Sequence, residues 1–331
     1  MTTATVTGNR ERESLGEFLL RAPAVGPALA LIVAIVVFSL ATDTFFDLDN
    51  LSTVVQQSLV VGTLALGQTL IILIAGIDLS NASSMVVATL VMAKLAAAGT
   101  NGFFALVVGL ILTVVVGLFI GTLATRIKLP AFIITLGTFT GLTAVAKLIA
   151  GGQAVPVTDG LLQWLGTKRY LFGGIPITYG MTLALIMFLI VWYALTKTAW
   201  GKHVYAVGNA PESARLSGIK VNRTVISVYV VAGVCFGIAA WQALGRTPNA
   251  DPNQFQLGNL DSITAVVLGG TSLFGGRGSV LGTLFGALVV AVLRSGLTQM
   301  GVDGNYQDLA TGALLIVAVV VDRIARRQQQ S

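Results

Sequence analysis

The side chains of this chain that could carry chemistry are few, and the first candidate is a glycine-spaced segment. Gly270 and Gly275 have the spacing of the first half of a phosphate-binding loop, but Gly276 and Arg277 follow where that loop requires Lys and then Ser or Thr. The segment also lies in an apolar run rather than between a strand and a helix. The sequence therefore argues against nucleotide binding by this chain.

Metal and nucleophilic chemistry have equally little support. The one histidine, His203, lies beside Lys202 in a basic loop, and the one cysteine, Cys235, lies in an apolar run. A metal site needs several convergent ligands, and a lone cysteine can form no intrachain disulfide. We expect no catalytic residue, no metal and no cofactor.

The composition indicates the class of protein that surrounds these residues. Hydrophobic residues make up 55% of the chain and charged residues 10%, and the mean hydropathy is +0.85, which predicts an all-α polytopic membrane protein. Ten apolar segments are candidate spans: residues 23–41, 54–75, 83–98, 103–125, 131–150, 177–195, 225–244, 263–274, 280–299 and 306–321. Glycines interrupt the segment from 263 to 299, which fits two short spans better than one long helix.

The distribution of charge predicts the topology. With ten spans and the N-terminus inside, most of the 20 Lys and Arg residues fall in cytoplasmic segments, as the positive-inside rule requires. The net charge of +6 is thus explained by topology and an anionic membrane surface, without nucleic acid. We expect no cleavable signal peptide, a cytoplasmic segment at 1–22, a transmembrane domain at 23–322 with a cytoplasmic loop at 197–223, and a cytoplasmic tail at 323–331.

Ionisable groups within the spans would mark an ion-coupled carrier, and the sequence offers no convincing one. Lys94, Lys147 and Arg294 lie near the predicted outer ends of their spans, where long basic side chains can reach the interface. Asp78 falls in a predicted cytoplasmic turn. Uncharged polar groups are more frequent and suit a neutral solute, although interhelical hydrogen bonds explain each of them equally well. The candidates for a translocation path are Gln68, Thr69, Asp78, Asn81, Thr135, Thr138 and Gln242.

Glycines with a spacing of four predict close helix packing. The pairs are Gly117/Gly121, Gly137/Gly141, Gly233/Gly237 and Gly282/Gly286. A weak internal similarity relates residues 66–69 (LGQT) to 268–271 (LGGT), and each precedes a glycine-containing turn.

A short helix is predicted in the most basic loop. Asn209 would be its N-cap, Glu212 would complete a capping box, Pro211 would occupy the first turn, and Gly218 would supply the left-handed position after the last turn. About eight residues at 1.5 Å each give a helix of about 12 Å, too short to span a bilayer and marginal alone in water. It therefore needs a partner surface, unless it only orders the loop.

Four segments also resemble a known family: residues 75–80 (AGIDLS), 129–138 (LPAFIITLGT), 208–219 (GNAPESARLSGI) and 260–278 (LDSITAVVLGGTSLFGGRG). They are similar to segments of the ribose/xylose/arabinose-type permeases of bacterial ATP-binding cassette importers, in order from about residue 45 to 320. The family usually has Val-Gly-Ser or similar where this chain has Asn81-Ala82-Ser83, which leaves the choice of substrate open.

The resemblance implies a permease subunit of the inner membrane that carries a monosaccharide by alternating access. Its partners would be a second permease protomer, identical or not, a cytoplasmic ATPase that hydrolyses the ATP, and an extracytoplasmic solute-binding protein. The segment 209–218 would be the coupling helix on the ATPase, with Glu212 and Arg215 in polar contact, Ala214 in close approach, and Asn209, Pro211 and Gly218 shaping the helix. The alternatives are a permease of the same architecture for branched-chain amino acids or nucleosides, and an ion-coupled secondary carrier.

Overall fold

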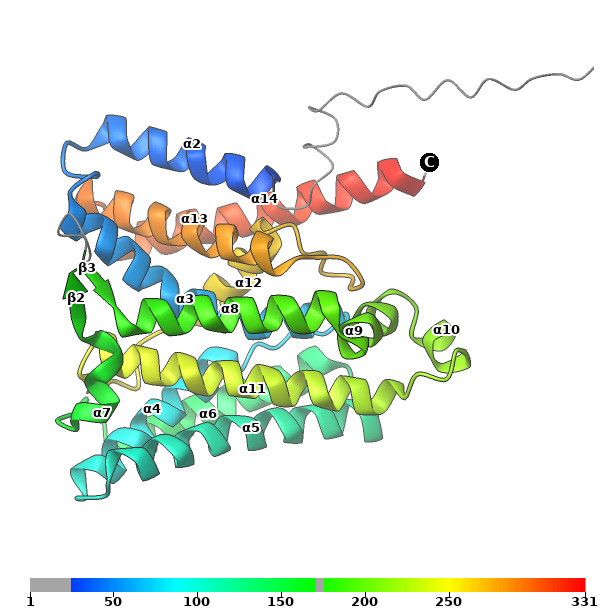
Figure 1. Cartoon of the computed structure of the whole chain (residues 1–331), viewed down its shortest axis with the longest axis horizontal. Coiled ribbons are helices and arrows are strands. Elements are labelled where there is room, and N and C mark those ends of the chain that lie inside the picture. Colours follow the sequence, from blue (N-terminus) through cyan, green and yellow to red (C-terminus); the bar gives the residue numbers. More distant parts are fainter. Residues whose placement is uncertain (1–24, 171–175, 331) are drawn as a thin grey trace, which may run out of the picture.

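The computed structural model describes residues 25–170 and 176–330, and most of them form helices that run between two ends of one bundle (Figure 1). The longer helices are α2 (Val25–Ala41), α3 (Leu48–Leu73), α4 (Asn81–Ala97), α5 (Gly102–Arg126), α6 (Ala131–Ala150), α8 (Tyr179–Lys197), α11 (Val221–Arg246), α12 (Gly258–Leu268), α13 (Val280–Gln299) and α14 (Gly304–Gln330). Each overlaps one predicted segment. The predicted segment 1–22 lies outside the described residues.

The lengths of these helices distinguish clear membrane spans from shorter ones. Within the described ranges, six helices are long and apolar enough to cross a bilayer: α3, α5, α6, α8, α11 and α13. The apolar parts of α2, α4, α12 and α14 are shorter. The prediction of a polytopic all-α membrane protein is therefore confirmed at this level, and ten crossings stay a prediction.

Helix α12 departs most from its predicted boundaries. It begins at Gly258 and ends at Leu268, whereas the sequence predicted a span over 263–274. Its 11 residues rise about 16 Å, roughly half of a bilayer's hydrocarbon core. The chain leaves the helix at Gly270, which has a left-handed φ of 76° and whose N–H donates to the carbonyl of Val267 over 2.9 Å.

Short elements connect the helices. They are α7 (Gly160–Gln163), the 3-10 helix η1 (Trp164–Gly166), α9 (Ala199–Asn209), α10 (Pro211–Leu216), and the strands β1 (Val155–Pro156), β2 (Lys168–Tyr170), β3 (Pro176–Thr178) and β4 (Asn249–Ala250). Strand β1 pairs antiparallel with β4, with Val155 opposite Ala250, and the N–H of Val157 donates to the carbonyl of Pro248 over 2.9 Å. The loop after α6 is thereby joined to the loop after α11. Strands β2 and β3 form a second antiparallel pair, with Arg169 opposite Ile177.

Three of the four glycine pairs make the close contacts expected of them. Helices α5 and α11 meet at Gly117 and Gly233. A side-chain carbon added to Gly117 would collide with the carbonyl of Tyr229, and one added to Gly233 would lie 2.6 Å from the carbonyl of Thr113. Gly286 lies equally close to the backbone of α12 at Ala265, and Gly282 lies equally close to Gly269, directly after that helix.

The fourth pair, Gly137/Gly141 on α6, does not pack in this way. An added side-chain carbon at either position would meet no atom within 4 Å. The prediction of tight packing is therefore wrong for this pair within the chain, because α6 covers the bundle with its other face, through buried residues such as Ile134 and Ala146.

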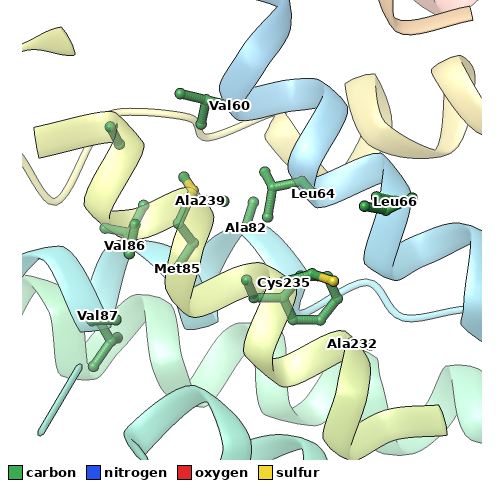
Figure 2. Packing of buried hydrophobic residues seen from close by; sticks show 14 of the residues in the cluster. Val60, Leu64, Leu66, Ala82, Met85, Val86, Val87, Ala232, Cys235 and Ala239 are labelled. Atoms are coloured by element: carbon green, nitrogen blue, oxygen red, sulfur yellow. The ribbon is translucent and has the colours of Figure 1, made fainter. Parts of the chain in front are cut away.

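The main apolar core lies between α3, α4, α5 and α11. Figure 2 shows side chains of α3, α4 and α11 meeting there, among them Leu64, Met85 and Cys235, which are all fully buried. The first residues of α2, the short helix α10 and the C-terminal end of α14 lie at the same end of this bundle, while β2, β3 and α7 lie at the opposite end (Figure 1). We call these the α10 end and the β end.

Candidate functional site

The short helix of the basic loop exists, but it begins differently from its prediction. Asn209 is the last residue of α9, and α10 covers only Pro211–Leu216 with Ala210 as its N-cap. Ala210 has no side chain that could cap, so the capping box with Glu212 is wrong. Pro211 occupies the first turn as predicted. The helix starts later because α9 continues through Asn209.

The end of α10 matches its prediction. Gly218 has a left-handed φ of 84°. The N–H of Gly218 donates to the carbonyl of Arg215 and the N–H of Ile219 to that of Ala214, both over 3.0 Å. These two bonds form a Schellman motif, which satisfies carbonyls at the end of the helix. Gly218 therefore fixes the turn that leads into α11.

The outward surface of α10 combines a charge pair with an apolar side chain. Arg215 and Glu212 form an ion pair of 2.7 Å, with their side chains 70% and 78% exposed. Leu216 is 85% exposed, whereas Ala214 is buried against its own chain at 4%. Ala214 was predicted to approach a partner closely, whereas Leu216 was not singled out. Their spacing of two was the available signal, because residues two apart on a helix face different ways.

Backbone contacts join α9 to the interior of the bundle. The N–H of Gly276 donates to the carbonyl of Leu73 over 2.9 Å. A side-chain carbon added to Gly208 would collide with the carbonyl of Leu73. One added to Gly276 would lie 2.8 Å from the backbone of Asn209. We call Leu73, Gly208, Gly275 and Gly276 the glycine junction. It connects α9, the end of α3 and the loop between α12 and α13.

Tyr205 makes a second connection from α9 to this loop. Its hydroxyl donates to the carbonyl of Gly278 over 3.0 Å. Burial raises the pKa of the Tyr205 phenol above its usual value, so that the group stays protonated and keeps its role as donor. A displacement of α9 would therefore act directly on the chain that leads into α13.

Five of the predicted path residues lie close together between α3, α4, α12 and α13. The amide of Gln68 lies 3.1 Å from that of Asn81 and within hydrogen-bond distance of the backbone of Asp78. Asn81 also donates to the hydroxyl of Ser262 over 2.8 Å. The carboxylate of Asp78 accepts from the N–H and hydroxyl of Ser80, over 2.7 and 2.6 Å. Asp78 is only 2% exposed, so its side chain is enclosed by the bundle in the turn that was predicted to be cytoplasmic.

Two threonines extend this polar cluster. The hydroxyls of Thr69 and Thr283 lie 2.7 Å apart and join α3 to α13. Thr135 donates from α6 to the carbonyl of Ile77 over 3.1 Å. In this conformation the cluster therefore holds helices together through hydrogen bonds.

Thr138 and Gln242 are not part of this cluster. Thr138 donates to the carbonyl of Ile134 in its own helix. The amide of Gln242 lies 3.5 Å from the carbonyl of Gly180, on another side of the bundle.

An ion-pair network near the β end was not predicted. Arg294 of α13 donates to Asp261 of α12 over 2.7 Å and to Asp308 of α14 over 3.0 Å. Arg294 was predicted to lie near an outer end of its span, where its side chain can reach the interface; the two carboxylate partners were not predicted. Its partners lie 33 and 14 positions away, so only the fold reveals the network.

Comparisons with known proteins cover almost the whole chain. A family model described as the permease component of the branched-chain amino acid transport system matches residues 50–319. The chain is 38% identical to the fructose import permease protein of Rhizobium meliloti, over 95% of this chain and 89% of that one. It is 35% identical to the ribose import permease protein of Escherichia coli K12, over 97% and 99% of the two chains. The galactose/methyl galactoside import permease protein of the same strain is 30% identical, over 89% and 92%. No solved structure matches the chain.

Proposed function

Because the chain belongs to the family of permease components of the branched-chain amino acid transport system, we propose that it is the membrane subunit of an ATP-binding cassette importer for a monosaccharide. The observation that carries this proposal is the similarity at 30–38% identity, over nearly the whole chain, to permeases named for fructose, ribose and galactose. The chemistry of the transport reaction is binding and release, and the ATP is hydrolysed by a partner subunit.

The α10 end faces the cytoplasm in this proposal, and α10 docks on the ATPase. Leu216 enters an apolar pocket of the ATPase, while Glu212 and Arg215 exchange their mutual ion pair for polar contacts with it. Ala214 anchors α10 to its own chain from the opposite face, and Asn209, Pro211 and Gly218 shape the connections. The exposed leucine supports this assignment together with the exposed ion pair beside it, because docking would bury the apolar side chain and give both charged groups new partners.

The glycine junction provides the route from the ATPase to the pathway. A helix that docks on a moving ATPase transmits force only through stiff contacts, and backbone contacts between packed segments are the stiffest available. Movement of α9 would displace the ends of α3 and α13 together. The polar cluster of Gln68, Asp78 and Asn81 lies along these helices, and its hydrogen bonds would exchange partners with sugar hydroxyls as the bundle reorients.

The remaining partners follow from the same family. We propose a second permease protomer, an extracytoplasmic solute-binding protein and an inner-membrane location. A branched-chain amino acid importer of the same architecture is the second candidate, since the family description names that substrate class.

Two measurements test this function. The first is co-purification with candidate ATP-binding cassette ATPases of the same organism, comparing wild type with a Glu212→Ala, Arg215→Ala, Leu216→Ala variant. The variant should lose the ATPase. Lys128→Ala is the matched control, an exposed cation after α5, and should retain it.

The second measurement is ATP-driven uptake into liposomes that contain the permease, the ATPase and the binding protein. Ribose or fructose should be taken up and leucine should not. Uptake of leucine alone would transfer the assignment to the amino acid class, and sugar uptake without any ATPase would indicate a secondary carrier.

A further inference from the structure

A cavity of about 410 Å³ opens in the half of the bundle that lies toward the β end. Its walls come from α3, α11, α12, α13, α14 and the loop before α12. Small-molecule sites in proteins range from about 300 to 1,000 Å³, so the cavity has the size for a compact solute. It is separate from the polar cluster of Gln68, Asp78 and Asn81, none of which lines it.

The charges that line the cavity balance. Asp261 and Asp308 supply two negative charges, and Arg294 and Arg246 supply two positive ones. Four glutamine side chains add neutral donors and acceptors: Gln57, Gln254, Gln256 and Gln307. An intramembrane site without net charge disfavours an ion but offers many hydrogen bonds to a neutral solute with several hydroxyls.

The ion-pair network leaves hydrogen-bonding capacity inside this cavity. Arg294 uses one nitrogen, Nη2, for both of its carboxylate partners. Its Nε is buried and has no hydrogen-bond partner among the residues that the structure describes. A buried donor without a partner is costly, so this strained end of the network favours a rearrangement of Arg294 when a solute hydroxyl approaches it. The side chain of Asp308 is 38% exposed, so its carboxylate is accessible as an acceptor.

An aromatic ring completes the lining. Phe255 has a left-handed φ of 58°, which is rare for a bulky residue. The turn that imposes it is closed by the N–H of Gly258, which donates to the carbonyl of Phe255 over 2.9 Å. Such strain is found mostly where a side chain must be held in one place for function. A sugar has C–H faces as well as hydroxyl edges, so a ring beside charged and amide groups matches its two kinds of surface.

The floor of the cavity is closed. Val290, which lines the cavity, also belongs to an apolar cluster with Ala65, Ile72, Val266 and Ala287, all of them buried. In this conformation the cluster separates the cavity from the α10 end. A solute that enters from the β end would therefore stop at the level of Arg294.

We propose that this cavity is a binding site for one monosaccharide within each permease subunit, where Arg294, Asp261 and Asp308 hold the hydroxyls and Phe255 covers one face of the ring. The proposal rests on the proposed function and assigns the point at which the solute is held before the bundle reorients.

The test uses the permease–ATPase complex in lipid nanodiscs without the solute-binding protein. Saturation-transfer NMR measures binding of ribose, fructose, allose, galactose and, for comparison, leucine. At least one sugar should bind. Asp308→Asn and Phe255→Asn should each weaken its binding about tenfold, the effect of losing one charge-assisted hydrogen bond or ring contact. Asparagine tolerates a left-handed φ, so Phe255→Asn removes the ring and keeps the turn.

The matched control is Asp303→Asn. Asp303 is exposed, lies outside the cavity, and its carboxylate accepts from the N–H of Asn305 over 2.9 Å, a role that the amide oxygen of asparagine also fills. Sugar binding should be unchanged in this variant.

ATP-driven uptake of the same compounds separates the two hypotheses. Uptake of a sugar that shows no binding to the complex, or binding that both cavity variants leave intact, would overturn the cavity site while the proposed function stands. Uptake of leucine alone would overturn the proposed function, and the sugar site with it.

Discussion

The two ends of this bundle are stabilised in different ways. At the α10 end, the glycine junction brings α9, α3 and the loop after α12 together through backbone atoms, and no side chain can be added at Gly208 without a collision. At the β end, α12, α13 and α14 are joined through the side chains of Arg294, Asp261 and Asp308, which line a cavity.

The two kinds of contact suit different tasks. Backbone contacts without intervening side chains have little room to change, and so they transmit a displacement. Side-chain ion pairs around a cavity can exchange partners, and so they accommodate a solute and respond to it. The same chain thus provides a rigid connection where the ATPase would dock and an adaptable site where the sugar would enter.

Among single substitutions at the two ends, Arg294→Met should cause the largest loss of stability. The substitution leaves two carboxylates near one another without their cation. Breaking a buried pair costs about 3–5 kcal/mol, and partial exposure of Arg294 should reduce this to about 2–3 kcal/mol. Thermal unfolding in detergent measures the loss.

A second substitution in the ion-pair network should recover part of the stability lost in Arg294→Met. Adding Asp261→Asn to Arg294→Met removes one unpaired charge and should recover roughly half of the lost stability. A double variant no more stable than the single one would show that Arg294 acts by packing rather than by charge.

Gly208→Ala should cause the next largest loss of stability. No second side-chain substitution should recover it, because the collision is with a backbone atom. The added methyl group collides with the carbonyl of Leu73, and overpacking of this kind costs about 1–3 kcal/mol. ATP-driven uptake should fall more than the binding of the ATPase, because docking on α10 survives while transmission is lost. Unchanged uptake would show that the glycine junction is not part of the coupling route.

Gly141→Ala is a matched comparison for Gly208, because the same substitution is made where the chain is open. No atom lies within 4 Å of the added carbon, so the change in stability should stay below about 1 kcal/mol. If nothing else covers this face of α6, ATP-driven uptake should stay close to that of the wild type. A loss of uptake together with a loss of dimer, seen by cross-linking, would show that a second protomer covers this face of α6.

Glu212→Ala should have the smallest effect on stability. The ion pair with Arg215 is highly exposed, and exposed pairs contribute about 0.2–1 kcal/mol at most. The ATPase should nevertheless bind more weakly, which co-purification at increasing salt would detect. Equal salt resistance of wild type and variant would remove Glu212 from the interface.

The helices could be predicted from the sequence because they depend on local apolar length, and all ten predicted segments overlap a helix. The end of α10 was equally predictable, since glycine is the residue that most readily takes the left-handed position found at 218. The start of α10 was not, because Asn209 extends α9, and α9 is held by tertiary contacts of Gly208 and Tyr205 rather than by its own propensity.

The parts of the site that could not be predicted depend on distant segments. Nothing in the local sequence distinguishes Arg294 from Lys94 or Lys147, and its carboxylate partners come from two other helices. The burial of Asp78 likewise follows from the return of the chain into the interior after α3, which the hydropathy pattern does not encode. Gly137/Gly141 and Gly117/Gly121 share one spacing, and only the arrangement of α5 against α11 separates the packed pair from the open one.

The pairing of β1 with β4 has a consequence for making chimeras between relatives. Val155 and Pro156 form a ladder with Ala250 and Asn249, although almost a hundred residues of sequence separate them, and the second strand leads directly into the loop that carries Phe255. Exchanging the loop after α6 alone would set a foreign strand against a native one. Substrate preference should therefore transfer between homologous permeases only when both loops are exchanged as a unit.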